Sequence, residues 1–198
     1  MPPLREAYLR MPRPDWACDV TIDDIHAARE RIVGGIRSTP MLRKQTLEPL
    51  VGQPVFLKCE NLQRTGSFKI RGAYNKVRSL SPGSAGVACA SAGNHAQGVA
   101  LAARLHGIGA VVCMAENATP AKIAATRAYG AEVVLHGTIW DEADEKAKQL
   151  VAERGYVYVH PFDDPQLIAG QGTLGLEVYQ DWSGVDVVVV PIGGGGLI

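Results

Sequence analysis

Lys69 is the residue in this sequence that is best placed to do chemistry. It ends a short loop, Thr65-Gly66-Ser67-Phe68-Lys69, just before a helical pattern, where backbone donors are free. A lysine in a loop is most often a solvated cation. A Schiff base, however, requires an amine that can lose its proton, and a partly dry site with a nearby cation favours that loss. Arg71 is the candidate for this cation.

Two glycine-containing segments could supply ligands for a cofactor beside Lys69. Ser91-Ala92-Gly93-Asn94-His95 follows an apolar run, and Gly193-Gly194-Gly195-Gly196 follows a valine-rich stretch that ends at Pro191. The four glycines present backbone N–H groups without Cβ atoms, which suits a phosphate dianion, and a following helix N-terminus would strengthen the site. An amine and a phosphate site together predict pyridoxal phosphate. Asn94 alone suits a helix cap as well as a ligand.

Three motifs carry a resemblance to a known family. Residues 60–73, Glu-Asn-Leu-Gln-Arg-Thr-Gly-Ser-Phe-Lys-Ile-Arg-Gly-Ala, resemble the lysine segment of threonine dehydratases and serine racemases, which are fold-type II pyridoxal-phosphate enzymes. Residues 90–98 resemble their asparagine loop, and residues 193–197 resemble their phosphate loop. The motifs follow the family's order and spacing, and the resemblance covers residues 20–198. The family's chains continue well beyond this point, so the resemblance implies truncation after the phosphate loop.

The resemblance implies a role for each motif. Lys69 would carry the cofactor as a Schiff base and remove the Cα proton of the substrate, while Phe68 would pack on the cofactor ring and Asn94 would bind the ring hydroxyl. The expected phosphate ligands are Gly193, Gly194, Gly195, Gly196 and Leu197. The expected substrate ligands are backbone N–H groups of Ser91, Ala92, Gly93, Asn94 and His95, at a helix start. The side chain of His95 receives no role.

The implied activity is that of a pyridoxal-phosphate-dependent threonine or serine dehydratase, an ammonia-lyase that converts L-threonine to 2-oxobutanoate and ammonia. An expected setting is isoleucine biosynthesis. One alternative is a racemase on the same fold. The resemblance implies that a racemase carries a serine hydroxyl where this sequence has Ala92, and a methyl group cannot deliver a proton. The other alternative is an inactive fragment.

The pattern of strands and helices predicts an α/β fold, and the resemblance implies two parallel-sheet, three-layer domains of the fold-type II kind with the large domain incomplete. Strands are expected at residues 55–60, 86–90, 110–114, 132–135, 156–159 and 185–190, the last buried on both faces. Helices are expected at about 22–35, from Lys69, at 94–106, from Pro120, from Trp140 and after Asp164. The charged residues 141–148 suggest a solvated face, with Trp140, Ala143, Ala147 and Leu150 buried.

The expected domains are an N-terminal arm at 1–19, a small α/β domain at 81–155, and a discontinuous large cofactor domain at 20–80 and 156–198. Because the chain stops two residues after the glycine run, we expect weak cofactor binding and little activity. We also expect the strand at 185–190, whose sequence suits burial on both faces, to gain an exposed face in this chain.

Composition narrows the class of partner. Twenty basic and twenty acidic residues leave no net charge, so neither nucleic acid nor a membrane is an expected partner. The expected partners are an amino-acid substrate and, in the full-length form, further copies of the chain. The four cysteines are scattered, which predicts no disulfide framework, no metal site and a cytoplasmic setting.

Residues 170–175, Gly-Gln-Gly-Thr-Leu-Gly, match a dinucleotide-binding fingerprint by letter. They do not directly follow a predicted strand, and no acidic residue stands about twenty residues further on. We therefore expect these glycines to permit close packing of helices.

Overall fold

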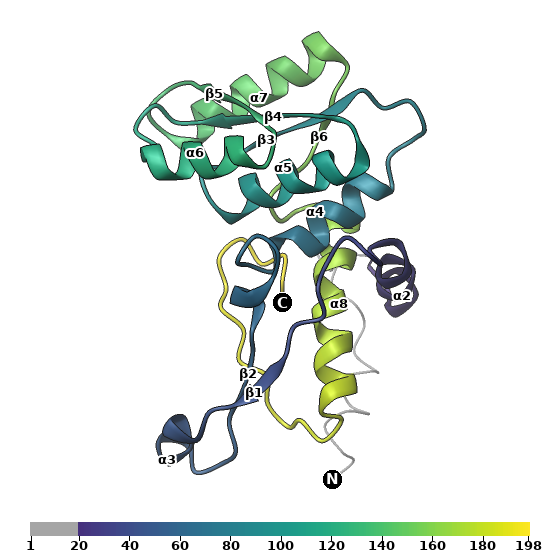
Figure 1. The fold of residues 1–198 in the computed structure, drawn as a ribbon, viewed down its shortest axis with the longest axis vertical. Coiled ribbons are helices and arrows are strands. Elements are labelled where there is room, and N and C mark those ends of the chain that lie inside the picture. The colour runs from purple at the N-terminus through teal and green to yellow at the C-terminus, as the bar shows by residue number, and fades with distance from the viewer. Residues whose placement is uncertain (1–19) are drawn as a thin grey trace, which may run out of the picture.

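A computed structural model describes residues 20–198, and Figure 1 shows its ribbon. The predicted arm at residues 1–19 lies outside the described residues. The strands are β1 Met41–Arg43, β2 Phe56–Lys58, β3 Gly86–Ala90, β4 Gly109–Met114, β5 Glu132–Leu135 and β6 Val157–Tyr158. The α-helices are α2 Ile22–Arg31, α3 Glu48–Val51, α4 Lys69–Arg78, α5 Asn94–His106, α6 Pro120–Ala128, α7 Trp140–Arg154 and α8 Pro165–Asp181. Gln45–Leu47 and Glu60–Leu62 form 3₁₀ helices.

The upper part of the molecule in Figure 1 is a four-stranded parallel sheet in the order β5-β4-β3-β6. Parallel strands need crossover helices, and these cover both faces of a sheet. Here α5 and α6 pack on one face and α7 on the other. Side chains alternate between the faces, so Val112 of β4 joins the α5 side while Val111 joins the α7 side. The predicted α/β fold is confirmed.

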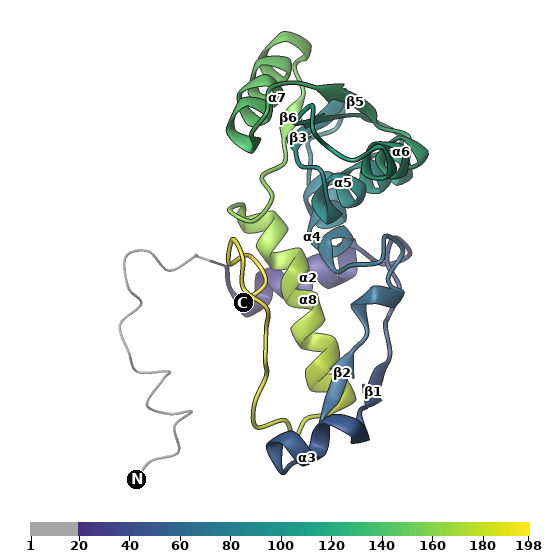
Figure 2. The same ribbon diagram turned by 90° about the vertical axis from the view of Figure 1, so that its left-hand side faces the viewer.

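Below the sheet, α4 lies between α5 and the long helix α8 (Figures 1 and 2). Helix α2 packs against α8, and β1 pairs with β2 in antiparallel fashion. Among the described residues, the second sheet is therefore this antiparallel pair and not the parallel sheet that we expected. The helix predicted at 22–35 ends earlier, at Arg31, and begins with the expected capping box between Thr21 and Asp24.

The strand predicted at residues 185–190 is wrong for this structure. These residues form no strand, and the side chains of Val187 and Val189 are 76% and 91% exposed. A strand needs a neighbour to satisfy its backbone N–H and C=O groups. No strand among residues 20–198 pairs with this segment, so its backbone has no ladder to join.

Helix α7 differs in two positions from its predicted pattern. Ala143, Ala147 and Leu150 are buried as expected, but Trp140 is 44% exposed and donates its indole N–H to Ala90 O at 3.0 Å. Asp144, predicted to face solvent, is 5% exposed because its carboxylate accepts from the Tyr158 hydroxyl and pairs with Lys148 at 2.7 Å. A charged residue thus enters the buried side because it has partners there.

The glycines of α4, α5 and α8 permit the close approach of these helices. A Cβ atom at Gly170 would lie 2.6 Å from Gly72 Cα, and one at Gly72 would lie 2.5 Å from Leu167 O. A Cβ atom at Gly98 would lie 3.2 Å from the Lys69 carbonyl carbon. The expected close packing thus holds for Gly170 of the apparent dinucleotide fingerprint and also for Gly172, where a Cβ atom would lie 2.7 Å from Ile25 Cδ1, but not for Gly175, which has open space. All three glycines lie inside α8 and not at a strand-to-helix turn. No helix within residues 20–198 has the length and apolar character needed to cross a bilayer.

Candidate active site

Lys69 is the first residue of α4, and its side chain is partly buried. Its Nζ atom donates a hydrogen bond to Pro161 O at 2.6 Å and lies 5.4 Å from the centre of the Phe68 ring. Burial lowers the pKa of the Lys69 amine from its ordinary value. A lowered pKa enlarges the neutral, nucleophilic fraction of the amine, as Schiff-base chemistry requires.

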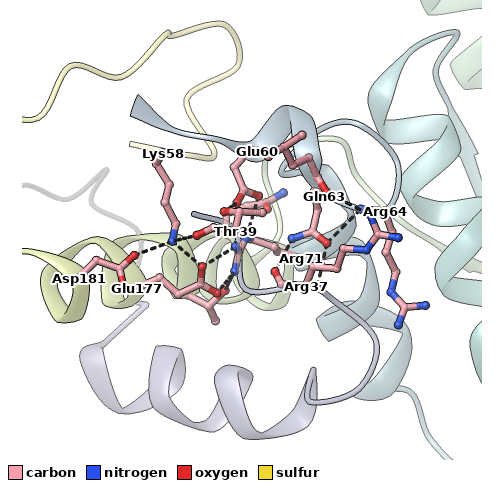
Figure 3. Close-up of polar contacts among 12 residues, drawn as sticks. Arg37, Thr39, Lys58, Glu60, Gln63, Arg64, Arg71, Glu177 and Asp181 are labelled. Carbon is pink, nitrogen blue, oxygen red and sulfur yellow. Dashed lines mark hydrogen bonds and ion pairs between the residues drawn. The ribbon is translucent and has the colours of Figure 1, made fainter. Parts of the chain in front are cut away.

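Arg71 does not act as the cation that lowers this pKa, which corrects our expectation. Its guanidinium is fully buried and directed to the Glu60 and Glu177 carboxylates, with contacts of 2.7–2.9 Å (Figure 3). Burial alone would lower the pKa of Arg71, but hydrogen bonds to the two glutamates raise it above its ordinary value. Arg71 therefore joins the 3₁₀ helix at 60–62 and α4 to α8, and burial alone explains the pKa of Lys69.

Lys58 extends this ionic cluster. Its Nζ atom lies 2.8 Å from Glu177 and 3.1 Å from Asp181, and it also donates to Thr39 O at 2.7 Å (Figure 3). Charged groups that lose water are stabilised when each has a partner of opposite charge. The cluster fixes β2 and α4 against α8. Because Lys69 is the first residue of α4, the cluster also fixes the backbone of Lys69.

The predicted asparagine loop connects β3 to α5. Gly93 is the N-cap residue of α5, no side chain caps the helix, and Ser91 Oγ accepts from the Gly93 amide at 3.2 Å. Asn94 is exposed at the first helical position, so it is not the cap. The first N–H groups of a helix have no partner within it and favour an anion. The geometry suits the carboxylate site that the sequence predicted here.

His95 is buried beside this loop. Its Nε2 atom lies 2.9 Å from Val159 O, and a carbonyl oxygen only accepts, so Nε2 carries the proton. Burial lowers the pKa of His95 to about 4, to which the charges of Lys69 and His160 also contribute. Nδ1 is buried and has no hydrogen-bond partner among the described residues. The ring is thus neutral with one free acceptor.

The glycine run lies against Phe162. A Cβ atom at Gly194 would overlap the Phe162 ring, and one at Gly196 would lie 2.7 Å from Phe162 O. Gly195 has a φ of +84°, a value that side chains rarely adopt, whereas Gly193 has open space around it. Leu197 is partly buried. Larger residues at 194 or 196 would displace the run from Phe162, so steric fit explains why both positions are glycine.

Residues 159–163 connect the three predicted motifs, and sequence reasoning missed them. Val159 O binds His95, Pro161 O binds Lys69, and Phe162 contacts the glycine run. The segment follows β6, whose pairing with β3 places it at the carboxyl edge of the parallel sheet. Ligands of open α/β sheets bind beyond that edge. This position was the available signal, because the predicted strand at 156–159 already pointed to it.

Two cavities lie near these elements. The larger, of about 580 Å³, is lined by residues 38–41 with Phe56, Asp181 and Trp182, and includes none of the predicted site residues. The smaller, of about 160 Å³, touches Ser91 and Ala92 at the carboxyl edge of the sheet. We place the candidate site at the carboxyl edge of the parallel sheet, on the same side as the smaller cavity. The Lys69 amine, the free amides at the start of α5 and the glycine run lie around this edge.

The residues present fit pyridoxal phosphate. They supply an amine of lowered pKa, an adjacent aromatic ring and a glycine run whose residues at 193 and 195 have open space around their Cα atoms. Ser67 Oγ and His95 Nδ1 are buried polar atoms without partners among residues 20–198, as a site for a polar ligand would have. Within the same residues, no three His, Cys, Asp or Glu side chains are grouped to hold a metal ion.

Comparison with known proteins gives concordant results. L-threonine ammonia-lyase of Thermotoga maritima is 51% identical over 181 residues, which are 90% of this chain and 45% of that protein. The catabolic L-threonine dehydratase of Escherichia coli K12 is 50% identical over 181 residues, 90% of this chain and 55% of that protein. The chain thus spans about half the length of the curated relatives that it matches.

Solved structures of similar fold include a T.th. threonine deaminase, with 46% identity, a TM-score of 0.82 and coverage of 89% of this chain and 58% of that one. Maize serine racemase has 37% identity, a TM-score of 0.87 and coverage of 92% and 55%. A pyridoxal 5'-phosphate-dependent aspartate racemase has 36% identity, a TM-score of 0.89 and coverage of 94% and 58%. The family model described as "Pyridoxal-phosphate dependent enzyme" matches residues 32–198. The chain therefore belongs to the pyridoxal-phosphate-dependent enzyme family, as its lysine, asparagine and glycine motifs indicated.

Proposed function

We propose that the protein is a pyridoxal-phosphate-dependent ammonia-lyase that converts L-threonine, or L-serine, to a 2-oxo acid and ammonia. The observation that carries this proposal is the meeting of three motifs at residues 159–163. Lys69 and His95 each bind a carbonyl of this segment, and the glycine run contacts its phenylalanine. The threonine ammonia-lyases and dehydratases at about 50% identity support the choice of substrate.

Each motif has a proposed role. Pyridoxal phosphate, when bound, supplies an electron sink for the negative charge that deprotonation leaves at the substrate Cα. Lys69 Nζ takes the Cα proton as a general base, for which its lowered pKa suits it. Phe68 lies beside the Lys69 amine, where its ring would exclude water from one side. The glycines at 193–196 and Leu197 would hold the phosphate, and Asn94 the ring hydroxyl.

The substrate carboxylate would bind the uncapped amides at the start of α5. Among the described residues, the amides of Ala92, Asn94 and His95 have no partner and are available there, whereas the Ser91 amide donates to Cys113 O and the Gly93 amide to Ser91 Oγ. The helix dipole favours an anion at this end. Binding the carboxylate there orients the Cα–H bond, and loss of the β-hydroxyl as water then competes with return of the proton.

A racemase is the second candidate, because serine and aspartate racemases are among the similar structures. Racemisation requires an acid on the face of the substrate opposite Lys69. Ala92 occupies the loop position where the family resemblance implies a serine in racemases, and its methyl group donates no proton. We therefore propose that elimination exceeds racemisation.

Further parts of this proposal rest on composition. We propose a cytoplasmic setting with homo-oligomers of the full-length protein, and neither nucleic acid nor membrane as a partner, since the net charge is zero. Isoleucine biosynthesis is the proposed metabolic setting.

We also propose that the small domain extends from residue 81 to Val159 and not to 155, because β6 pairs with β3. The remaining residues from 20 onward would form the large domain.

Borohydride reduction of the protein with pyridoxal phosphate tests the proposal. We expect peptide mapping to locate the reduced cofactor on Lys69 and Lys69→Ala to lose this label. Any formation of 2-oxobutanoate from L-threonine, which we expect to be low in this chain, should also be lost. Lys122→Ala is the matched control, because Lys122 is exposed on α6. Labelling at another lysine, or faster formation of D-enantiomer than of 2-oxo acid, would overturn the assignment.

A further inference from the structure

His160 forms a turn that the proposed reaction does not use directly. Its Nδ1 atom accepts hydrogen bonds from the backbone N–H groups of Asp163, at 2.7 Å, and Phe162, at 3.3 Å. An imidazole nitrogen that accepts from amides two and three residues later closes a turn much as an Asn or Asp side chain does. The ring also packs edge-on against Phe162, with ring centres 4.6 Å apart. The imidazole therefore fixes the backbone of residues 160–163.

This turn presents its Pro161 carbonyl to the catalytic amine. Lys69 Nζ lies 2.6 Å from Pro161 O, and this is the hydrogen bond that the structure gives to the amine. A neutral amine has two N–H donors and one lone pair. When one N–H is held by a carbonyl, the lone pair is directed away from the main chain of residues 160–163. The orientation of the nucleophile thus depends on where the turn places its carbonyl.

Both ends of the turn are anchored independently. Val159 O, on its N-terminal side, is bound by His95, and Asp164 on its C-terminal side caps α8 through the amides of Gln166 and Leu167. Between these anchors, only the His160 imidazole satisfies the amides of Phe162 and Asp163 among the described residues. Loss of that acceptor would leave two N–H groups without partners and release Pro161 O from its position.

We propose that His160 is a positioning residue, whose Nδ1 atom holds the turn at 160–163 so that Pro161 O orients the Lys69 amine and Phe162 supports the glycine run. This role rests on the proposed function of Lys69. It concerns a hydrogen-bond acceptor and not an acid or base, so an acceptor of similar reach should replace it. Asparagine is the conservative choice, because its Oδ1 atom accepts from the same two amides in an Asx turn.

The test compares His160→Ala with His160→Asn in the cofactor-free 198-residue chain. Trace labelling with acetic anhydride across a pH series gives the apparent pKa of Lys69, with the exposed Lys122 as internal standard. In the alanine variant the turn opens and water reaches the amine, so burial lowers its pKa less. The comparison is made at a pH below the pKa of Lys69 in both the unmodified chain and the alanine variant. There we expect Lys69 labelling, relative to Lys122, to fall about three- to tenfold, equivalent to a rise of half to one unit in the pKa of Lys69.

The asparagine variant should label within about twofold of the unmodified chain, since its acceptor is retained. His106→Ala, at the exposed end of α5, is the matched histidine control and should also label as the unmodified chain does. Equal labelling of the alanine variant and the unmodified chain would overturn the role of His160. An equal fall in the alanine and asparagine variants would also overturn it, because ring size and not hydrogen bonding would then matter.

Hydrogen exchange in the unmodified chain keeps the proposal testable if His160→Ala does not fold. The Asp163 amide should exchange at least about tenfold more slowly than an unstructured peptide, because its proton is held by Nδ1. Exchange at the rate of an unstructured peptide would overturn the proposal. Neither measurement uses cofactor or substrate. If Lys69 labelling falls in the alanine variant and not in the asparagine variant, while borohydride traps the cofactor on another lysine, the proposed function is overturned and the role of His160 in orienting Lys69 is supported.

Discussion

Two valine-rich stretches of this chain have opposite fates. In β4, Val111 and Val112 are 1% and 0% exposed, because the strand pairs with β3 and β5 and is covered by helices on both faces. At residues 185–190 the side chains of Val187 and Val189 are mostly exposed, and no strand of residues 20–198 pairs with this segment. The difference shows that β-propensity describes how well a residue fits a paired, covered surface, and does not itself create that surface.

Hydrogen exchange should give the largest contrast between the two stretches. Amides of Val111 to Cys113 exchange only through opening of the sheet, whereas those of Val187 to Val190 have no ladder to hold them. We expect protection in β4 to exceed that at 187–190 by roughly 1000-fold, the size that a few kcal/mol of opening free energy gives. Equal protection in the two stretches would break the comparison, since it would require the second to be paired in solution.

A fall in pH should act on the part of the molecule that contains the sheet and not on residues 183–198. His95 anchors α5 to the end of β6, whereas no histidine lies in residues 183–198. The pKa of the His95 imidazole is lowered to about 4 in the folded chain, against an ordinary value near 6.5. As the pH falls through this window the unfolded chain takes up a proton that the folded chain does not. The resulting loss is roughly 2.5 kcal/mol in the free energy of unfolding between pH 7.5 and pH 4.5.

Urea titrations of His95→Gln at these two pH values test that loss. Glutamine keeps an N–H donor for Val159 O but does not titrate, so the variant should lose about 2 kcal/mol less stability than the unmodified chain. His106→Gln, on the exposed last turn of the same helix, should behave as the unmodified chain does. An identical acid response in all three proteins would show that His95 is not the group responsible.

Paired truncations should give the smallest effect. Val112→Ala removes two methyl groups from the interface between β4 and α5 and should lower the free energy of unfolding by about 2 kcal/mol. Val189→Ala removes the same groups from an exposed side chain and should change it by less than about 0.5 kcal/mol. Urea titration measures both. A cost at Val189 as large as at Val112 would mean that this valine is buried in solution.

The parts of the fold that the sequence predicted are those set by local signals. Thr21 and Asp24 form their capping box, Asp164 caps α8 ahead of Pro165, and the alternation from residue 86 gives the parallel sheet. Each depends on residues a few positions apart. The buried Asp144 was missed because its partner, Tyr158, lies on another element and is reached only through tertiary packing.

The candidate site shows the same division between local and tertiary signals. Lys69, the asparagine loop and the glycine run each have a recognisable local sequence, whereas the partners of Arg71 and the turn at His160 do not. Arg71 binds Glu177, which is 106 positions away in the chain, and Lys69 binds a carbonyl 92 positions away. A backbone carbonyl can also accept a hydrogen bond whatever side chain its residue carries, so the sequence does not show which carbonyl is used. Such contacts belong to the assembled fold.

The contact of Gly98 with the backbone of Lys69 has a mechanical consequence. Because a Cβ atom there would lie 3.2 Å from the Lys69 carbonyl carbon, α5 and the start of α4 already touch, and neither can advance toward the other. The lysine and the asparagine loop are therefore held at a fixed minimum separation, which a side chain at position 98 would increase. The glycine run contacts Phe162, in the same turn whose Pro161 carbonyl binds Lys69, so a residue larger than glycine at 98, 194 or 196 would alter the spacing of the motifs.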